Sequence, residues 1–363
     1  MFRALLPINF FSMLFAFMAL ATTAYTAQTS EHSQAVILQY HHVSEHTPAS
    51  TSIAPQQFIQ HLNLIEDQGF QVLPLPEIIA NLKQDKGFSQ KTLAITFDDG
   101  YLSIYENAFP ELKKRNLPFT IFISPKAIDK QFGNSLSWQQ LKEMQQHGGT
   151  IANHSYQHLH LLAKNNHEPL KQWQQRTQQD IQLSQQRLKD ELNITNSLFA
   201  YPYGEFDQPL KTLLKSLGYV AFAQQSGPVS SSSDMQALPR FPASGIYANL
   251  DTLTVKINSL AFDIVGTQPQ SQLRLLGAAA PALKLRVKAQ DVQYQQTQCF
   301  YMGTAIPTQV TKIGDELLIS AQRPSPLNPG RSRYNCTAPS LSKKCHYWYS
   351  MPFINEPVNG RWQ

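Results

Sequence analysis

Short apolar runs alternate with amphipathic segments along the chain up to about residue 260. Runs of this length are typical of buried strands, and the segments between them repeat their apolar residues at helical spacing. The expected strands span residues 35–40, 72–75, 93–97, 119–123, 150–153, 197–201, 219–223 and 238–241. The expected helices span residues 55–69, 76–82, 105–115, 137–148, 169–192, 209–217 and 250–260. This alternation predicts an α/β fold.

The pattern changes near residue 266, where apolar and polar residues begin to alternate with a period of two, as at 283–287 and 316–320. Pro and Gly interrupt the remaining sequence, and both features are typical of antiparallel sheets. We therefore predict a first domain at 34–262 and a small all-β domain at 270–363. We expect the second domain to dock on the first, with glycan binding as the alternative.

The N-terminus has the features of a secretory signal peptide at residues 1–27. Arg3 precedes the apolar run 10–21, and small residues follow it. An uncleaved membrane anchor is the alternative, although the run is shorter than the ~20 residues that span a bilayer. We expect an exported protein, located in the periplasm or outside the cell.

Charge and cysteine content narrow the possible partners. The net charge of +5 is not concentrated in a Lys/Arg block, so nucleic acid is not an expected partner. Cys299, Cys336 and Cys345 allow at most one disulfide, which agrees with export. The sequence leaves the pairing open, and the absence of a Cys-x-x-Cys motif argues against a zinc cluster there.

Two adjacent carboxylates, Asp98 and Asp99, follow the expected strand 93–97 and precede Gly100. Neighbouring carboxylates at a buried strand end repel each other, and desolvation disfavours both unless a cation is near. A glycine allows the chain to turn so that both side chains face one cavity. The pair therefore indicates a metal site, with a solvated Asp-Asp-Gly turn as the alternative.

Candidate polar residues follow several of the expected strands: His41, the Asp98 pair, His154 and Tyr203. Such residues gather at the C-terminal mouth of a parallel barrel, although a flat doubly wound sheet would also align them. His154 and His158 are four residues apart, a spacing that places both rings on one face of a helical turn. With an Asp as third ligand they would leave open positions for water and substrate, unless they are ordinary surface histidines.

Three motifs in this order resemble those of the polysaccharide deacetylases, carbohydrate esterase family 4: Thr-Phe-Asp-Asp-Gly at 96–100, His-Ser-Tyr-Gln-His at 154–158 and Pro-Tyr-Gly at 202–204. The resemblance covers residues 34–262. It implies a distorted (β/α) barrel and metal-dependent removal of acetyl groups from a glycan, which is hydrolysis of a linear amide where the acetyl is N-linked.

The resemblance also implies roles for individual residues. Asp99, His154 and His158 would bind a divalent metal ion, with zinc the default and nickel, cobalt or iron also suited to imidazole and carboxylate ligands. Asp98 would be the general base, and the backbone N–H of Tyr203 would stabilise the oxyanion. His160 is out of phase with the histidine pair, so we expect a supporting or surface residue.

The sequence departs from the family pattern at two places. Ala200 occupies the position of the arginine that orients the base, and Arg240 is our candidate replacement, with a surface arginine as the alternative. No Leu-x-His follows Arg240. The strand 36–40 and the histidine after it resemble that final motif moved to the front, as in circularly permuted deacetylases of exported poly-N-acetylglucosamine. Either His41 or His42 can face inward, and we expect His41 as the general acid.

The predicted function is therefore metal-dependent deacetylation of an N-acetylglucosamine-type polysaccharide, with association with the cell envelope as a further expectation. Two other classes fit the same residues. The first is a catalytically weak glycan-binding module, and the second is an exported metal-dependent amidase or esterase acting on small molecules or peptidoglycan. The sequence specifies neither the polysaccharide linkage nor the oligomeric state.

Overall fold

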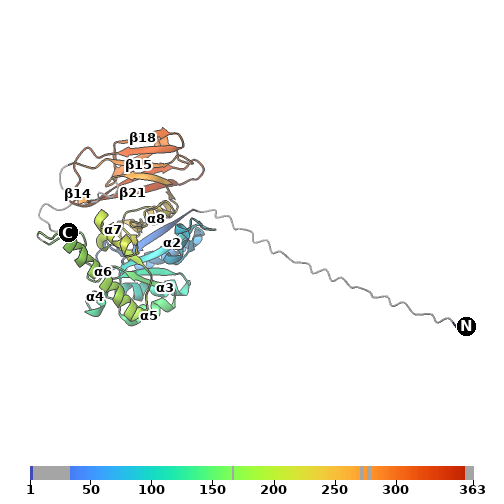
Figure 1. Cartoon of the computed structure of the whole chain (residues 1–363), viewed down its shortest axis with the longest axis vertical. Coiled ribbons are helices and arrows are strands. Elements are labelled where there is room, and N and C mark those ends of the chain that lie inside the picture. The colour runs from blue at the N-terminus through green and yellow to red at the C-terminus, as the bar shows by residue number, and fades with distance from the viewer. Residues whose placement is uncertain (3–32, 166, 270–273, 276–278, 356–363) are drawn as a thin grey trace.

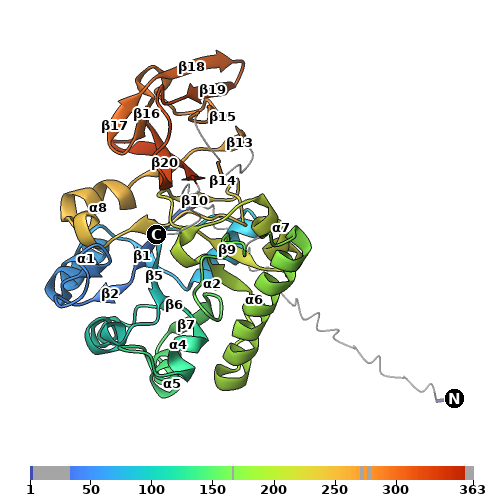
Figure 2. The same cartoon turned by 90° about the vertical axis from the view of Figure 1, so that its left-hand side faces the viewer.

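The computed structural model describes residues 1–2, 33–165, 167–269, 274–275 and 279–355. A barrel-like α/β domain carries a second, strand-rich region on one side, next to α7 (Gln208–Ser216) and α8 (Leu250–Ile257) (Figures 1 and 2). The predicted signal peptide, apart from its first two residues, lies outside the described residues. No helix in the described part of the chain combines the length and the apolar character needed to cross a bilayer.

A nine-stranded sheet forms the centre of the α/β domain. Its strands run in the order β10 (Val229–Ser230), β1 (Gln34–Tyr40), β5 (Thr92–Asp99), β6 (Phe119–Ile123), β7 (Gly149–Asn153), β8 (Leu198–Ala200) and β9 (Val220–Phe222), with β4 (Gln71–Val72) beside β5 and β11 (Phe241–Pro242) beside β1. The pairs from β1 to β9 are parallel, so the carboxyl ends of these strands meet at one edge. Only β10 runs antiparallel to its neighbour among the strands of this sheet.

The sheet curls until its two sides approach each other. Leu238 forms a parallel bridge with Phe222 of β9, and Phe241 pairs with Leu38 of β1. The segment between Leu238 and Phe241 thus connects β9, the last strand of the parallel series, to β1, the first. The prediction of a distorted barrel is confirmed, and the flat doubly wound alternative is wrong.

Helices and short turns surround the sheet. They are α1 (Pro55–Asp67), α2 (Leu75–Lys83), η1 (Ile104–Ala108), α3 (Phe109–Lys114), α4 (Pro125–Asp129), α5 (Trp138–Gln146), α6 (Leu170–Leu192), η2 (Pro202–Gly204), α7, η3 (Gly245–Tyr247) and α8. Ser137 caps α5 with the reciprocal hydrogen bonds of a capping box, as its sequence indicates. The sequence pattern predicts neither α4 nor the two-residue strand β10. Leu170, the first residue of α6, is 48% exposed.

The C-terminal region consists of two antiparallel-rich sheets. One contains β12 (Leu260–Ala261), β21 (His346–Asn355), β20 (Gly330–Pro339), β16 (Gln298–Tyr301), β17 (Thr304–Ile306) and β14 (Arg274–Leu275). The other contains β13 (Ile264–Gln268), β15 (Leu283–Lys288), β19 (Glu316–Ala321) and β18 (Thr308–Ile313). A disulfide between Cys299 and Cys336 links β16 to β20, and Cys345 is a free thiol.

Apolar contacts join this region to the barrel. A single cluster of buried side chains includes Trp173 of α6, Phe199 of β8 and Leu285 of β15. The Trp348 ring of β21 meets the Phe241 ring edge to face at 5.4 Å. Because the two regions share a continuous core, the C-terminal sheets are held close to one side of the barrel.

Candidate active site

The two adjacent carboxylates lie inside β5, where the sequence pattern had placed them just beyond a strand ending at Phe97. The strand is longer because Asp98 and Asp99 still pair with β6. Asp99 and Gly100 then adopt the left-handed conformation, with φ of 71° and 73°. A side chain on Gly100 would come within 2.9 Å of the Ile123 side chain, so this turn requires glycine.

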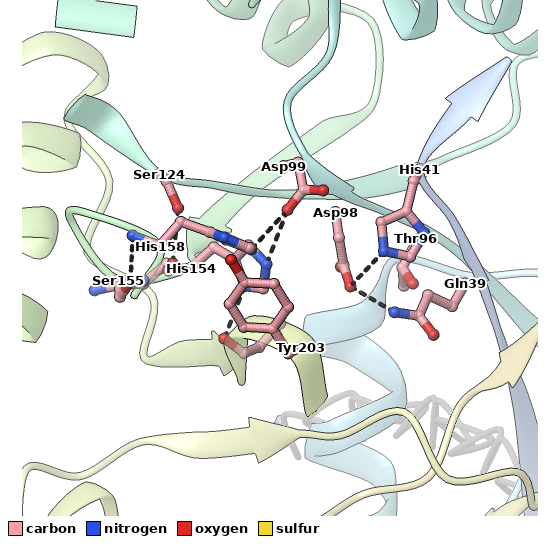
Figure 3. A network of polar contacts seen from close by, with 12 residues as sticks. Gln39, His41, Thr96, Asp98, Asp99, Ser124, His154, Ser155, His158 and Tyr203 are labelled. Carbon is pink, nitrogen blue, oxygen red and sulfur yellow. Dashed lines mark hydrogen bonds and ion pairs between the residues drawn. The ribbon is translucent and has the colours of Figure 1, made fainter. Parts of the chain in front are cut away.

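Asp99 forms one half of the site together with two histidines. Its Oδ1 lies 3.2 Å from Nε2 of His154 and 3.0 Å from Nε2 of His158 (Figure 3). The three ligand atoms all lie within 4.8 Å of one another. Burial raises the pKa of Asp99, but the two imidazoles outweigh burial and hold that pKa well below its ordinary value.

The two histidines converge through a loop rather than a helical turn, so our prediction of their local structure is wrong. Ser155 and His158 both have positive φ, of 63° and 55°. The Asn153 side chain accepts a hydrogen bond from the Ser155 N–H at 2.9 Å, and Ser155 Oγ accepts one from the His158 N–H at 3.1 Å. Such turns compete with helix and bring residues four apart to one side by another route.

The donor set fits a divalent metal ion. Oδ1 of Asp99 is buried and has no hydrogen-bond partner, although two imidazole nitrogens are close to it. Nδ1 of His154 lies 2.8 Å from the carbonyl oxygen of Ala200. When Nδ1 donates its hydrogen there, the Nε2 lone pair faces Asp99, which is the tautomer a metal ligand needs. Two imidazoles and a carboxylate leave coordination positions open.

Asp98 forms the other half of the site and is completely buried. Nη1 and Nη2 of Arg240 donate to its two oxygens at 2.7 and 2.8 Å, and Nε2 of Gln39 donates at 2.6 Å. Burial raises the pKa of Asp98, but Arg240 outweighs burial and keeps it below the ordinary value. The carboxylate is therefore ionised and fixed in orientation.

Arg240 is not a surface arginine, because its side chain is fully buried. Its Nε donates to the carbonyl oxygen of Ala223 at 3.0 Å, and Nη1 also donates to Thr96 Oγ1 at 3.2 Å. These bonds fix the plane of the guanidinium so that it meets Asp98 with two parallel hydrogen bonds.

Of the two histidines that follow β1, His41 faces the carboxylates. Its Nε2 lies 4.0 Å from Oδ2 of Asp98. The ring of His42 instead stacks on Tyr101, with centroids 3.6 Å apart. Burial lowers the pKa of His41, and the nearby carboxylates offset this only in part.

Tyr203 lies beside the histidine cluster (Figure 3). Its backbone is left-handed, with φ of 59°, and its ring meets the edge of His158 at 4.6 Å. The Tyr203 ring also stacks on His160 at 3.9 Å, and Nδ1 of His160 is 2.8 Å from Glu205. His160 is thus a supporting residue and lies outside the group of three that can hold an ion.

The sequence analysis missed Gln39 and Glu205. Gln39 was detectable, because it is the one amide side chain within the otherwise apolar run 35–40 that the structure buries. Glu205 carries no such signal, because an acidic residue in a loop after Pro-Tyr-Gly is typical of a solvated turn. Its burial, at 2% exposure, is visible only in the structure.

Comparisons with known proteins agree with this geometry. Residues 85–222 match the family model described as polysaccharide deacetylase. A Bacillus subtilis protein, YxkH, whose name places it among the polysaccharide deacetylases, is 31% identical over 214 residues, which cover 59% of this chain and 72% of that protein. The poly-beta-1,6-N-acetyl-D-glucosamine N-deacetylase of Staphylococcus epidermidis is 30% identical over 230 residues, 58% of this chain and 79% of that enzyme.

Solved structures share the barrel. IcaB from Ammonifex degensii superposes with a TM-score of 0.54 at 25% identity and covers 62% of this chain and 98% of its own. The Streptococcus pyogenes deacetylase PplD, solved in complex with acetate, gives a TM-score of 0.56 at 23% identity, 62% of this chain and 99% of its own. Sequence and fold lead to the same assignment: the chain is an enzyme that belongs to the polysaccharide deacetylase family.

Proposed function

We propose that this enzyme removes N-linked acetyl groups from a polysaccharide of the N-acetylglucosamine type, with the help of a divalent metal ion. The proposal rests on the different surroundings of the two adjacent carboxylates. Asp98 is paired with a cation, whereas Oδ1 of Asp99 points at two imidazole nitrogens and lacks a hydrogen-bond partner. Relatives named for poly-beta-1,6-N-acetyl-D-glucosamine make that polymer the first substrate to test.

Asp99, His154 and His158 would hold the ion, and zinc is the first choice, with nickel, cobalt or iron as other metals suited to this donor set. A bound divalent ion supplies Lewis-acid polarisation of the acetyl carbonyl and lowers the pKa of a water molecule toward ~7. The second effect matters here because Asp98, with its lowered pKa, is a weak base.

Asp98 is the general base in this proposal. Arg240 donates to both oxygens of Asp98 and Gln39 donates to Oδ2, so Oδ1 keeps a lone pair that can accept a proton. Arg240 also keeps the carboxylate ionised and stops it from rotating. Asp98 thus starts the reaction by accepting the proton that the attacking water loses.

His41 is the general acid for the leaving nitrogen. Because burial lowers its pKa, the ring is neutral at the start and must gain a proton before it can donate one. The proton that Asp98 accepts from water would pass to His41, whose Nε2 lies 4.0 Å from the Asp98 carboxylate, and from His41 to the leaving nitrogen. The products then balance as acetate and an amine, and the backbone N–H of Tyr203 stabilises the negative oxygen that forms between them.

We also propose how the chain is organised around this activity. Residues 1–27 would direct export to the periplasm or beyond, where the acetylated polymer lies at the cell envelope. Residues 34–262 would carry the chemistry, and the β-rich part at 270–363 would dock on that domain.

One assay tests the function. Zinc-loaded full-length protein is incubated with acetylated oligosaccharides of several backbones, including β-1,6-linked N-acetylglucosamine, and each product is weighed. Each reaction removes about 42 mass units, which follows from replacing an acetyl group by hydrogen in the hydrolysis. The Asp98→Asn variant is the control and should be inactive.

The same assay separates the alternatives. A glycan-binding module would give no mass loss and no difference between wild type and Asp98→Asn. A small-molecule amidase would deacetylate the monosaccharide as well as the oligomer, whereas a polysaccharide enzyme should favour the oligomer. Absence of mass loss from every backbone would reject the proposed function.

A further inference from the structure

The C-terminal region reaches the barrel's active site through one arginine. Arg331 lies on β20, and its Nη1 donates a hydrogen bond to the carbonyl oxygen of Tyr203, 128 residues earlier in the chain. Its guanidinium carbon lies 5.9 Å from the centre of the Tyr203 ring, and its Nε is 3.9 Å from Oε1 of Glu205. Two residues of the same loop are therefore held by a single side chain from the other domain.

Glu205 shows why a cation is needed at this place. Only 2% of its surface is exposed, and a buried carboxylate is costly unless positive charge and hydrogen-bond donors surround it. His160 approaches one of its oxygens at 2.8 Å, and Arg331 approaches the other. The positive charge of Arg331 thus lies beside the buried carboxylate of Glu205, and Glu205 in turn holds the His160 ring.

The loop between these groups holds a backbone conformation that is unfavourable for a tyrosine. Tyr203 has φ of 59° and ψ of 4°, and such residues persist only where their surroundings impose the conformation. Its ring lies parallel to the His160 ring, at an angle of 10°, and its carbonyl is bonded to Arg331. Both restraints on Tyr203 therefore trace back to the Arg331 and Glu205 pair.

We propose that Arg331 is a positioning residue for the deacetylation reaction. It holds the Tyr203 loop so that the Tyr203 N–H faces the oxygen that becomes negative in the transition state. This inference rests on the proposed function, in which that N–H is the oxyanion donor. It also gives the C-terminal sheets a role in catalysis, because the barrel alone lacks the cation that fixes this loop.

The matched control is Arg333, two residues further along the same strand. It also reaches the barrel, where its Nη2 is 3.3 Å from the Tyr247 hydroxyl, but it does not contact the Tyr203 loop. Arg331→Ala and Arg333→Ala each remove one arginine from the contact between the two domains. Only the first removes the restraint on Tyr203.

Two measurements on the zinc-loaded full chain test the proposal. For Arg331→Ala we expect kcat to fall about 10- to 100-fold with KM and zinc affinity little changed, since removal of a whole oxyanion donor costs about 100- to 1000-fold and this change only misplaces one. Amide hydrogen exchange at residues 203–205 should also accelerate. Arg333→Ala should match wild type in both. Arg331→Lys keeps the charge and can reach one partner, so it should recover part of kcat and remain testable even if the alanine variant unfolds.

The outcomes are distinct. Wild-type kcat and exchange in Arg331→Ala, or no recovery in Arg331→Lys, would overturn the positioning role. Equal effects of Arg331→Ala and Arg333→Ala would overturn it as well, because they would mean that any loosening of the domain contact suffices. If wild type releases no acetate from any substrate, the proposed function fails, and the exchange comparison still decides whether Arg331 restrains the loop.

Discussion

The buried pair between Asp98 and Arg240 gives the sharpest prediction. In the Arg240→Met variant the guanidinium is lost, but an unbranched apolar side chain still fills much of its volume. Asp98, with no exposed surface, then keeps only the hydrogen bond from Gln39. The carboxylate is left buried next to β1 without a cation.

The size of the effect follows from the contacts that are lost. Arg240 donates two charge-assisted hydrogen bonds to Asp98, at 2.7 and 2.8 Å. Removing one partner of a buried ion pair costs about 3–5 kcal/mol, mainly because the other charge remains unpaired. In the double variant Asp98→Asn with Arg240→Met no charge is left unpaired. It should therefore be more stable than Arg240→Met alone, which gives a coupling energy of about 2–3 kcal/mol.

The assay is a double-mutant cycle. The free energy of unfolding of wild type, both single variants and the double variant is measured by urea denaturation followed by far-ultraviolet circular dichroism. Acetate release is measured in parallel, and Arg240→Met should lose about 100- to 10,000-fold in kcat/KM, as expected when a general base is misplaced or protonated.

The reasoning would be refuted by two results. One is a free energy of unfolding for Arg240→Met that lies within about 0.5 kcal/mol of the wild-type value, which is the range of ordinary surface substitutions. The other is a double variant whose stability equals the sum of the two single losses, because additive effects mean that the side chains do not interact.

Three further predictions concern the metal, the acid and pH. Dialysis against a chelator should abolish activity, and added zinc should restore it. His154→Ala should weaken zinc binding, measured by calorimetry, by more than the about 10- to 100-fold loss that is typical when a residue only supports a ligand. Unchanged zinc affinity would contradict the assignment of His154 as a ligand. His41→Ala should lose more activity on acetamides than on acetate esters with good leaving groups. His42→Ala should have nearly wild-type activity, because the ring of His42 stacks on Tyr101. If His42→Ala lost amide activity and His41→Ala did not, the roles of the two histidines would be exchanged. Burial raises the pKa of Asp291, but hydrogen bonds from Ser340 and its neighbours outweigh burial and bring it to about 2. A carboxyl group whose pKa is lower in the folded state stabilises the fold at pH values above its unfolded pKa of ~3.9, and that stability is lost as the pH falls from about 4 to 2. Asp291→Asn should therefore lower the Tm at pH 7, and the Tm values of variant and wild type should converge near pH 2.

The sequence pattern predicted the central strands of the barrel because they are buried on both faces and are therefore mostly apolar. β6 (Phe119–Ile123) matches its expected range, and β1 and β7 differ by one residue at the start. In a parallel sheet the residues that follow such runs meet at one edge, so the candidates His41, Asp99 and His154 could be found without knowing any distance.

Other features depend on contacts that no local pattern records. The spacing of His154 and His158 suits a helical turn, yet the Asn153 and Ser155 side chains stabilise a loop that serves the same end. β10 was missed because two residues paired at the edge of a sheet leave no periodicity to detect. Arg331 could not be assigned at all, since its partner is 128 residues away and belongs to another domain.

The arrangement around Asp98 explains why a rearranged order of motifs is compatible with one active site. Gln39 reaches Asp98 from β1, which pairs with β5 on one side and with β11 on the other. Arg240 comes from the residue just before β11, at the far end of the domain sequence. Because these strands are neighbours in the curled sheet, the partners of the base are set by adjacency in space, and the loops that join them can be redistributed at modest entropic cost. The same reasoning covers Ala200: its side chain donates nothing, but its carbonyl still orients His154, while the guanidinium that the base needs arrives from a different strand.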